Sequence, residues 1–140
     1  MAADVCGHAD AGATALREAK YAWAGQLRAS GDRDRALKLY KELASDVKTR
    51  EGSEAAYYVI EALFESRELG KTESEVFAFS DREPNAYWLA KAFLLLGDVY
   101  VRKGDTFQAR ATYQSVADGY SPADDGIVDE AKERIAKLKN

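Results

Sequence analysis

Only a few side chains of this sequence are of types that carry out chemistry, and the two rarest lie together near its start. Cys6 is the single cysteine and His8 the single histidine among 140 residues. Both can ligate a metal, but a structural zinc site takes four ligands at recognisable spacings. Catalysis needs a base, a nucleophile or a metal held in a pocket. The pair therefore predicts neither a metal site nor a catalytic one.

Carboxylates are more numerous, and two arrangements of them bear on function. Glu61 and Glu65 lie one helical turn apart, which permits acid–base work in an enclosed site but on a surface helix is usually a solvated pair. A second group of carboxylates comprises Asp118, Asp124, Asp125, Asp129 and Glu130. This group lacks the spacing of a calcium-binding loop, and capping of the last helix explains part of it. No Gly-rich phosphate loop or nucleophile elbow occurs. The sequence predicts a protein that is not an enzyme and needs no cofactor.

The composition is that of one folded, helix-rich domain. Hydrophobic residues make up 46% and charged residues 31% of the chain, and Pro84 and Pro122 are its only prolines. A net charge of −4 repels nucleic-acid backbones, so no nucleic-acid partner is expected. The sequence has no long apolar run, so insertion into a membrane is not expected. It also has no signal segment, so a cytoplasmic location is expected. The alternative is a periplasmic or cell-envelope location as part of a longer secreted chain.

The strongest pattern is a set of small, aromatic and Gly-Asp residues that recurs after 73 positions. The later copy consists of Leu96, Gly97, Tyr100, Gly104, Asp105, Ala109 and Tyr113. The same slots in the earlier copy hold Trp23, Ala24, Leu27, Gly31, Asp32, Ala36 and Tyr40. A weaker copy lies halfway, with Arg67 and Glu68 in place of the Gly-Asp break. Such a period is typical of stacked repeats.

Within each copy the apolar residues follow a helical spacing on both sides of the break, which predicts a helix, a tight turn and a second helix. Seven helices and no strands are expected, over 11–30, 33–47, 53–68, 71–81, 85–103, 106–119 and 125–139. The predicted layout is a flexible leader over 1–13 and a single domain over 14–140. Its repeats span about 17–52, 53–89 and 90–122, and a capping helix spans about 125–139. Small residues at the recurring slots permit close helix approach, and Trp23 is expected in the core.

These slots resemble the tetratricopeptide repeat, whose pattern is a bulky residue, Leu-Gly, Tyr, Gly-Asp, Ala, Tyr and Pro. The third copy matches best, and it is similar to the last repeat of large bacterial tetratricopeptide proteins of the Bacteroidetes type. The resemblance implies an all-α, right-handed solenoid of three helical hairpins plus the capping helix. It also implies a scaffold that binds a peptide or helix of another protein in a concave groove.

The groove residues follow from the resemblance, because the first helix of each hairpin lines the concave face in this family. They are Tyr21, Gly25, Arg28, Tyr57, Tyr58, Glu61, Phe64, Glu65, Lys91, Leu94, Leu95, Asp98 and Arg102. The positions that clamp a carboxylate in chaperone-binding members hold other residue types here, so capture of a C-terminal carboxylate is not expected. Aromatics among acids suit an apolar segment that carries a few basic residues.

Two alternatives stay open. The aromatics Tyr57, Tyr58, Tyr87 and Trp88 either contact a partner or pack within and between repeats. The chain itself is either an adaptor or a structural module, being a terminal segment of a larger array or a unit that self-associates into a homo-oligomer.

Overall fold

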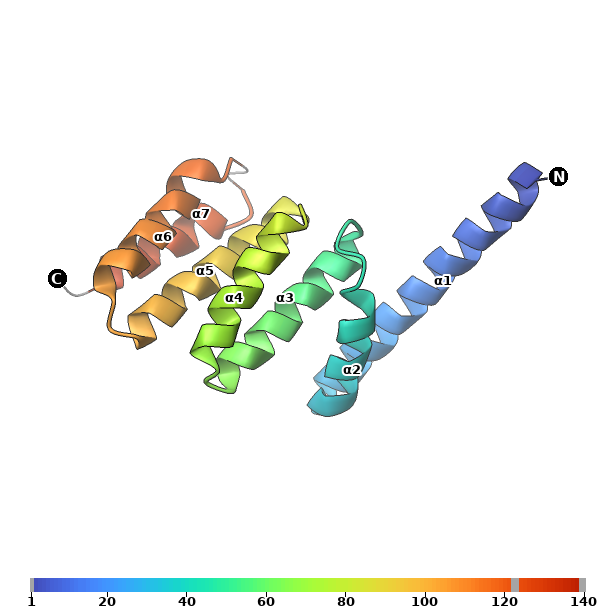
Figure 1. Cartoon of the computed structure of the whole chain (residues 1–140), viewed down its shortest axis with the longest axis horizontal. Helices are drawn as coiled ribbons and strands as arrows, with labels where there is room; N and C mark the ends of the chain where they lie inside the picture. Colours follow the sequence, from blue (N-terminus) through green and yellow to red (C-terminus); the bar gives the residue numbers. More distant parts are fainter. Residues whose placement is uncertain (1, 122–123, 139–140) are drawn as a thin grey trace. The chain divides into compact units, whose positions relative to one another are not determined.

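Helices are the only regular secondary structure over the residues that the structure describes. The computed structural model covers residues 2–121 and 124–138, with side chains from residue 11 onward. The helices are α1 (Ala2–Ala29), α2 (Arg33–Leu43), α3 (Arg50–Glu65), α4 (Leu69–Asp81), α5 (Ala86–Arg102), α6 (Thr106–Gly119) and α7 (Ile127–Lys137) (Figure 1). No strand occurs in these ranges, so the all-α prediction is confirmed.

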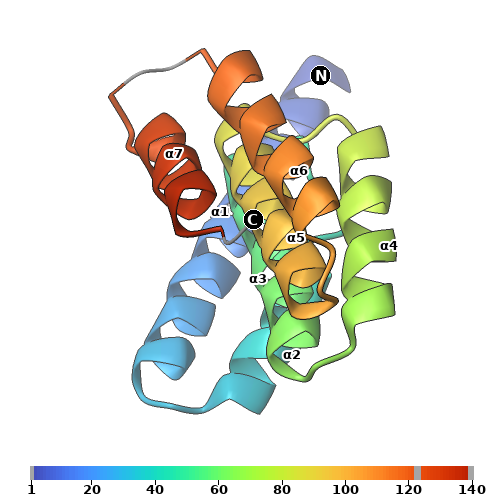
Figure 2. The same cartoon turned by 90° about the vertical axis from the view of Figure 1, so that its left-hand side faces the viewer.

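The chain divides into two compact units, Met1–Val59 and Ile60–Asn140. In the first unit α1 packs on α2, and in the second α5 packs on α4, α6 and α7. Figure 2 shows α4 and α7 on opposite sides of α5 and α6. The single domain predicted over 14–140, with its three repeat boundaries, stays a prediction.

Two inter-helix turns contain the Gly-Asp break that the sequence analysis singled out. Between α1 and α2, Gly31 has a φ of 88°, and Asp32 Oδ1 accepts a hydrogen bond from the Arg35 amide at 3.3 Å. Between α5 and α6, Gly104 has a φ of 78°, and Asp105 caps α6 in the same way. Glycine adopts this left-handed backbone without strain and ends one helix, and the aspartate starts the next.

The turn between α3 and α4 reaches the same geometry without glycine. Arg67 has a φ of 65°, and Glu68 precedes α4 without a side-chain hydrogen bond to its amides. A left-handed backbone strains a residue that carries a Cβ atom, by about 1–2 kcal/mol. The weaker middle copy therefore keeps the shape of the break and loses the residues that favour it.

Replacing Arg67 by glycine is expected to stabilise the second unit by about 1 kcal/mol, because it relieves this backbone strain. Urea unfolding followed by circular dichroism measures the change. Ser66→Gly, one residue earlier and without positive φ, is the matched control and is expected to be neutral or destabilising. Equal effects of the two substitutions would contradict the assignment of strain to Arg67.

Small residues at the recurring slots lie where helices approach most closely. In the first unit Ala24 and Ala36 are buried in one cluster with Leu39, Tyr40 and Leu43. In the second unit Gly97 of α5 faces the ring of Tyr113 so closely that a Cβ atom built on it would lie 2.2 Å from a ring carbon. The prediction that these slots hold the helix contacts is confirmed.

The start of the chain differs from the sequence-based expectation. Where a flexible leader was predicted over 1–13, the structure begins α1 at Ala2, so that the first half of α1 extends past α2 (Figure 1). In the later copy, Pro84 and the N-cap residue Asn85 directly precede α5, so that this helix begins at Ala86. Seventy-three residues earlier, Ala11 stands in the place of Pro84 and permits the helix to continue. Met1 lies outside the described residues.

The prediction that Trp23 is a core residue is wrong, since its side chain is 55% exposed. Its counterpart Leu96 is buried on α5, which packs against α4. In the first unit no helix takes the place that α4 has beside α5.

Candidate partner-binding surface

The predicted groove residues fall into both units, so they form two groups that are described separately. The first unit holds Tyr21, Gly25, Arg28, Tyr57 and Tyr58. The second holds Glu61, Phe64, Glu65, Lys91, Leu94, Leu95, Asp98 and Arg102.

In the first unit the tyrosines are bound to a glutamate that sequence reasoning missed. The Tyr21 hydroxyl donates to Glu54 Oε1 at 2.8 Å, and the Tyr58 hydroxyl donates to Glu54 Oε2 at 2.9 Å. Burial, together with the hydrogen bond to Glu54, raises the pKa of Tyr21 to about 12 and also raises that of Tyr58. Glu54 is itself buried, so the two hydroxyls satisfy a carboxylate that would otherwise be costly to enclose. The Tyr21 bond joins α1 to α3, whereas the Tyr58 bond lies within α3.

Little of this group remains accessible to a partner. Tyr57 is buried, and the Tyr58 ring packs at 4.9 Å from the Tyr40 ring. Arg28 is exposed and places its guanidinium carbon 3.8 Å above the Tyr58 ring, a cation–π contact. Of the two readings left open, packing applies to Tyr57, whereas Tyr58 is half-buried beneath the exposed Arg28.

In the second unit, Leu94 and Leu95 do not line an exposed groove as the resemblance implied. Their side chains are 2% and 6% exposed. The physical reason is that α5 is packed by α4, α6 and α7, so its apolar residues on several sides belong to the core. A partner cannot reach either leucine in this arrangement.

Lys91 and Asp98 are occupied by α7. The Arg134 guanidinium donates from Nε to Asp98 Oδ1 at 3.1 Å and from Nη1 to Glu130 Oε1 at 3.2 Å. The Tyr113 hydroxyl also donates to Asp98, and Lys91 lies 3.7 Å from Glu130. These residues fasten the capping helix to α5 and α6. Arg134 and Glu130 were missed because nothing in the repeat pattern relates α7 to α5.

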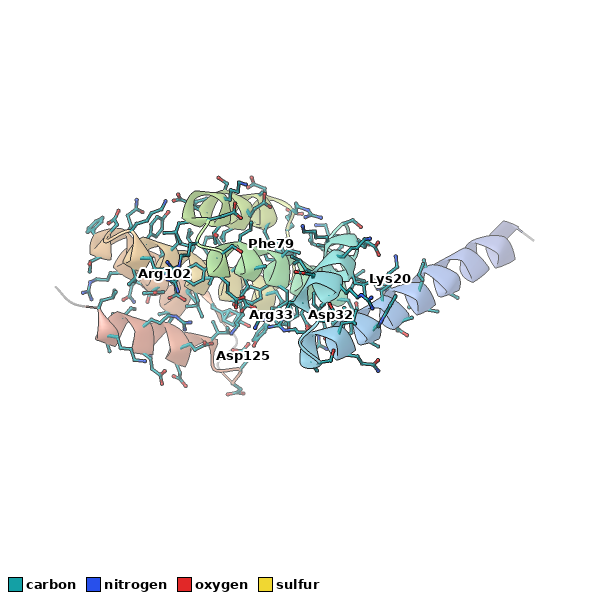
Figure 3. All side chains as sticks on the ribbon, turned by 90° about the horizontal axis from the view of Figure 1, so that it is seen from below. Lys20, Asp32, Arg33, Phe79, Arg102 and Asp125 are labelled. Carbon is teal, nitrogen blue, oxygen red and sulfur yellow. The ribbon has the colours of Figure 1, made fainter. Side chains whose placement is uncertain are left out.

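Four predicted residues remain together at the surface of the second unit. Arg102 is exposed near the end of α5 (Figure 3) and stacks its guanidinium carbon 4.1 Å from the centre of the Phe64 ring on α3. Glu61 and Glu65 lie one turn apart on α3, on either side of Phe64 in sequence, and Glu65 is exposed. We call Glu61, Phe64, Glu65 and Arg102 the α3–α5 surface. It combines an aromatic ring, a cation and two acids.

Other apolar side chains are exposed that the sequence analysis did not select, among them Phe77 on α4 and Phe107 on α6, the latter 83% exposed. Nothing in the repeat pattern distinguishes them from core aromatics. The aromatics Tyr87 and Trp88 are half-buried and pack edge to face on each other at 5.0 Å.

The acidic residues near the C-terminal end act within the fold. Asp125 Oδ1 accepts a hydrogen bond from the Ile127 amide at 3.2 Å, at the start of α7, and Asp118 accepts one from the Gln114 side chain. Among the described residues, no three side chains of His, Cys, Asp or Glu gather as a metal-binding group. Across the same residues, no helix combines the length and apolarity needed to cross a bilayer.

The pair of Tyr100 and Glu73 predicts how the stability of the second unit depends on pH. The Tyr100 hydroxyl donates to Glu73 at 2.5 Å, and this bond lowers the pKa of Glu73. Burial and the same bond raise the pKa of Tyr100 to about 12. The stability that Glu73 contributes is fully present at pH values above its ordinary pKa. It is lost as the pH falls through its lower pKa in the folded protein. That of Tyr100 is present below pH about 10 and is lost as pH rises through about 12.

Tyr100→Phe is therefore expected to cost about 1 kcal/mol of unfolding free energy at neutral pH and less at both extremes. Urea unfolding of wild type and variant at neutral, acidic and strongly alkaline pH measures this. Tyr87→Phe, on the same helix, is the control and is expected to change little. A pH-independent effect of Tyr100→Phe would contradict the role of the Glu73 bond.

Comparison with known proteins adds one finding. Residues 91–121 match the family model described as the tetratricopeptide repeat. This range nearly coincides with the third repeat predicted over 90–122, and it contains α6 and most of α5. No curated protein matches the chain.

Proposed function

Because residues 91–121 match the tetratricopeptide repeat, we propose that this chain binds a segment of another protein at its α3–α5 surface. A protein-interaction scaffold is the general role that such a repeat indicates, and the family's typical use of the fold is not catalytic. The specific role proposed here is that of an adaptor without enzymatic activity. The adaptor reading is preferred to a purely structural module because this surface is accessible.

The observation that supports the proposal best is the stack of Arg102 on Phe64. A guanidinium that lies flat on a ring keeps part of its edge free to donate hydrogen bonds, and the ring supplies apolar contact area. Aromatic residues and arginine are the side chains most enriched among those that dominate binding energy at protein interfaces. Both are present at one accessible place.

The charges of the surface define the kind of partner. Glu61 and Glu65 flank Phe64 on α3, and carboxylates attract Lys and Arg side chains over several ångströms. An apolar side chain that packs against Phe64, with basic residues directed at the two acids, satisfies both features. We therefore expect a segment that carries an apolar anchor beside one or two basic residues. Arg28 above Tyr58 in the first unit is a cation–aromatic pair of the same chemistry.

Selection of peptides from a random displayed library on the immobilised chain tests this proposal. The expected result is an enrichment of peptides with apolar and basic residues that disappears when the library is selected on the Glu61→Lys, Glu65→Lys variant. Circular dichroism verifies that the variant keeps its helix content. Selection on Phe107→Ala is the control, since Phe107 is an exposed aromatic of α6 that is not part of the α3–α5 surface. Peptides that survive the charge reversal, or an enrichment of acidic peptides, would refute the proposal.

A further inference from the structure

Asp98 and Arg102 lie one helical turn apart on α5, but each binds a different partner. Residues four positions apart are neighbours on the surface of a helix, and an acid that precedes a base by four positions forms a favourable ion pair with it. Asp98 instead accepts hydrogen bonds at Oδ1 from the Tyr113 hydroxyl of α6 and from Arg134 Nε of α7, the latter at 3.1 Å. Arg102 stacks on the ring of Phe64. The acid and the base that α5 brings together are thus held by other helices.

Arg134 supplies the positive charge that Asp98 requires in its surroundings. The side chains of Arg134 and Asp98 are 31% and 28% exposed, so neither ion is fully hydrated. Burial acts to lower the pKa of Arg134, but the charges and hydrogen bonds of Asp98 and Glu130 raise it overall. If one partner of a partly buried ion pair is removed, the other is left with an uncompensated charge. Without Arg134, Asp98 would therefore attract another cation within its reach.

Arg102 is the basic residue of α5 best placed to take that role. The two other basic residues in or directly after this helix, Lys91 and Lys103, are paired with glutamates of α7 and α4. Arg102 is exposed, and its long side chain can span the single turn to Asp98. A guanidinium stacked on a ring at the surface is held more weakly than one that donates hydrogen bonds to a partly buried carboxylate. Arg102 is therefore expected to leave Phe64 when Asp98 has lost its partner.

We propose that Arg134 is a positioning residue of the α3–α5 surface: by pairing with Asp98, it keeps Arg102 stacked on Phe64. In this way α7 controls the side chain that supplies the positive charge of the surface. The inference rests on the proposed function, because it concerns the regulation of the same surface. The stack itself, however, can be measured on the free chain without a partner.

NMR spectroscopy of the full chain measures the stack, because the ring current of Phe64 shifts the signals of the Arg102 side chain. Arg102→Lys assigns these signals, and Phe64→Leu gives their positions without a ring. Arg134→Met removes the cation and keeps an unbranched side chain. It is expected to lose at least half of the ring-current shift, whereas Arg134→Lys, which keeps the charge, is expected to lose less.

A double variant separates this positioning role from a general loosening of α7. In Arg134→Met, Asp98→Asn the negative charge that would capture Arg102 is absent, while the amide oxygen can still accept the hydrogen bond of Tyr113. The double variant is expected to regain the wild-type shift. Loosening of α7 would instead leave the shift lost in both variants. That result, or a wild-type shift in Arg134→Met alone, would overturn the proposal.

The affinity of a peptide selected on wild type distinguishes a failure of this inference from a failure of the proposed function. Arg134→Met is expected to bind the peptide roughly threefold to tenfold more weakly, and the double variant is expected to bind it like wild type. If Phe64→Ala binds as tightly as wild type, the proposed function fails, and the role of Arg134 in binding fails with it. If Phe64→Ala binds weakly and Arg134→Met binds like wild type, only the role of Arg134 is overturned.

Discussion

Replacing Gly97 by alanine is expected to destabilise the second unit by about 3 kcal/mol, since overpacking a close contact between helices costs in this range. The added Cβ atom would lie 2.2, 2.6 and 2.7 Å from three carbons of the Tyr113 ring. Tyr113 cannot move away easily, because it is buried and its hydroxyl is bound to Asp98. The substitution must therefore shift α6 against α5 or force the ring into a strained rotamer.

Chemical unfolding monitored by circular dichroism and by the fluorescence of Trp88 measures this change, in a Trp23→Phe background so that only the second unit is reported. Gly25→Ala is the control, since Gly25 also lies inside a helix but has no atom within 4 Å of an added Cβ. It lies in the first unit and is expected to leave the transition reported by Trp88 unchanged. A Gly97→Ala variant as stable as wild type would show that α5 and α6 are not packed as described.

Replacing Gly52 by alanine is expected to have a comparable or larger effect on the first unit. Its added Cβ atom would lie 1.8 Å from the carbonyl oxygen of Asp46 and 2.6 Å from the carbonyl carbon. These are backbone atoms of the connection between α2 and α3, which Ser53 also holds by donating to the Val47 carbonyl at 2.6 Å. Relief requires the connection to move as a whole, so a loss of about 3 kcal/mol or more is expected.

The fluorescence of Trp23 in a Trp88→Phe background reports this loss, because Trp23 lies in the first unit. Gly12→Ala is the control: Gly12 is exposed on α1 and has nothing within 4 Å of an added Cβ. The account is contradicted if Gly52→Ala unfolds at the same denaturant concentration as Gly12→Ala.

The helices and their turns could be predicted from sequence because their signals are local. Gly31 and Gly104 end helices through their own backbone freedom, and the aspartates that follow them cap the next helix. The spacing of Ala24, Ala36 and their counterparts likewise reports the helix contacts directly. Even the turn without glycine, at Arg67, fell where the period placed it.

Several errors concern residues whose surroundings depend on distant parts of the chain. Trp23 occupies a core slot of the repeat, but its side chain is 55% exposed. Leu94 and Leu95 occupy a groove position of the family, yet they are buried on a helix packed on several sides. Arg134 binds Asp98 across 36 positions, and no periodic signal predicts that pair. Burial and ion pairing depend on which residues lie nearby in the folded structure, and a single sequence does not specify those residues.

The candidate site was therefore predictable only in part. Helical position on α3 places Glu61, Phe64 and Glu65 within two turns of each other, and their role as groove residues stays a prediction. The stacking of Arg102 on Phe64 depends on the distance between α3 and α5, which the sequence does not give. This contact between Arg102 and Phe64 places a cation and an aromatic ring side by side on one surface.

The affinity of one selected apolar and basic peptide for wild type, Phe64→Ala and Phe107→Ala tests the central claim most directly. Titration calorimetry is expected to give at least about tenfold weaker binding to Phe64→Ala, which corresponds to about 1.4 kcal/mol for the loss of an interface anchor. Binding to Phe107→Ala is expected to match wild type. Equal affinity for Phe64→Ala and wild type, with helicity intact in both, would contradict the assignment of partner binding to the α3–α5 surface.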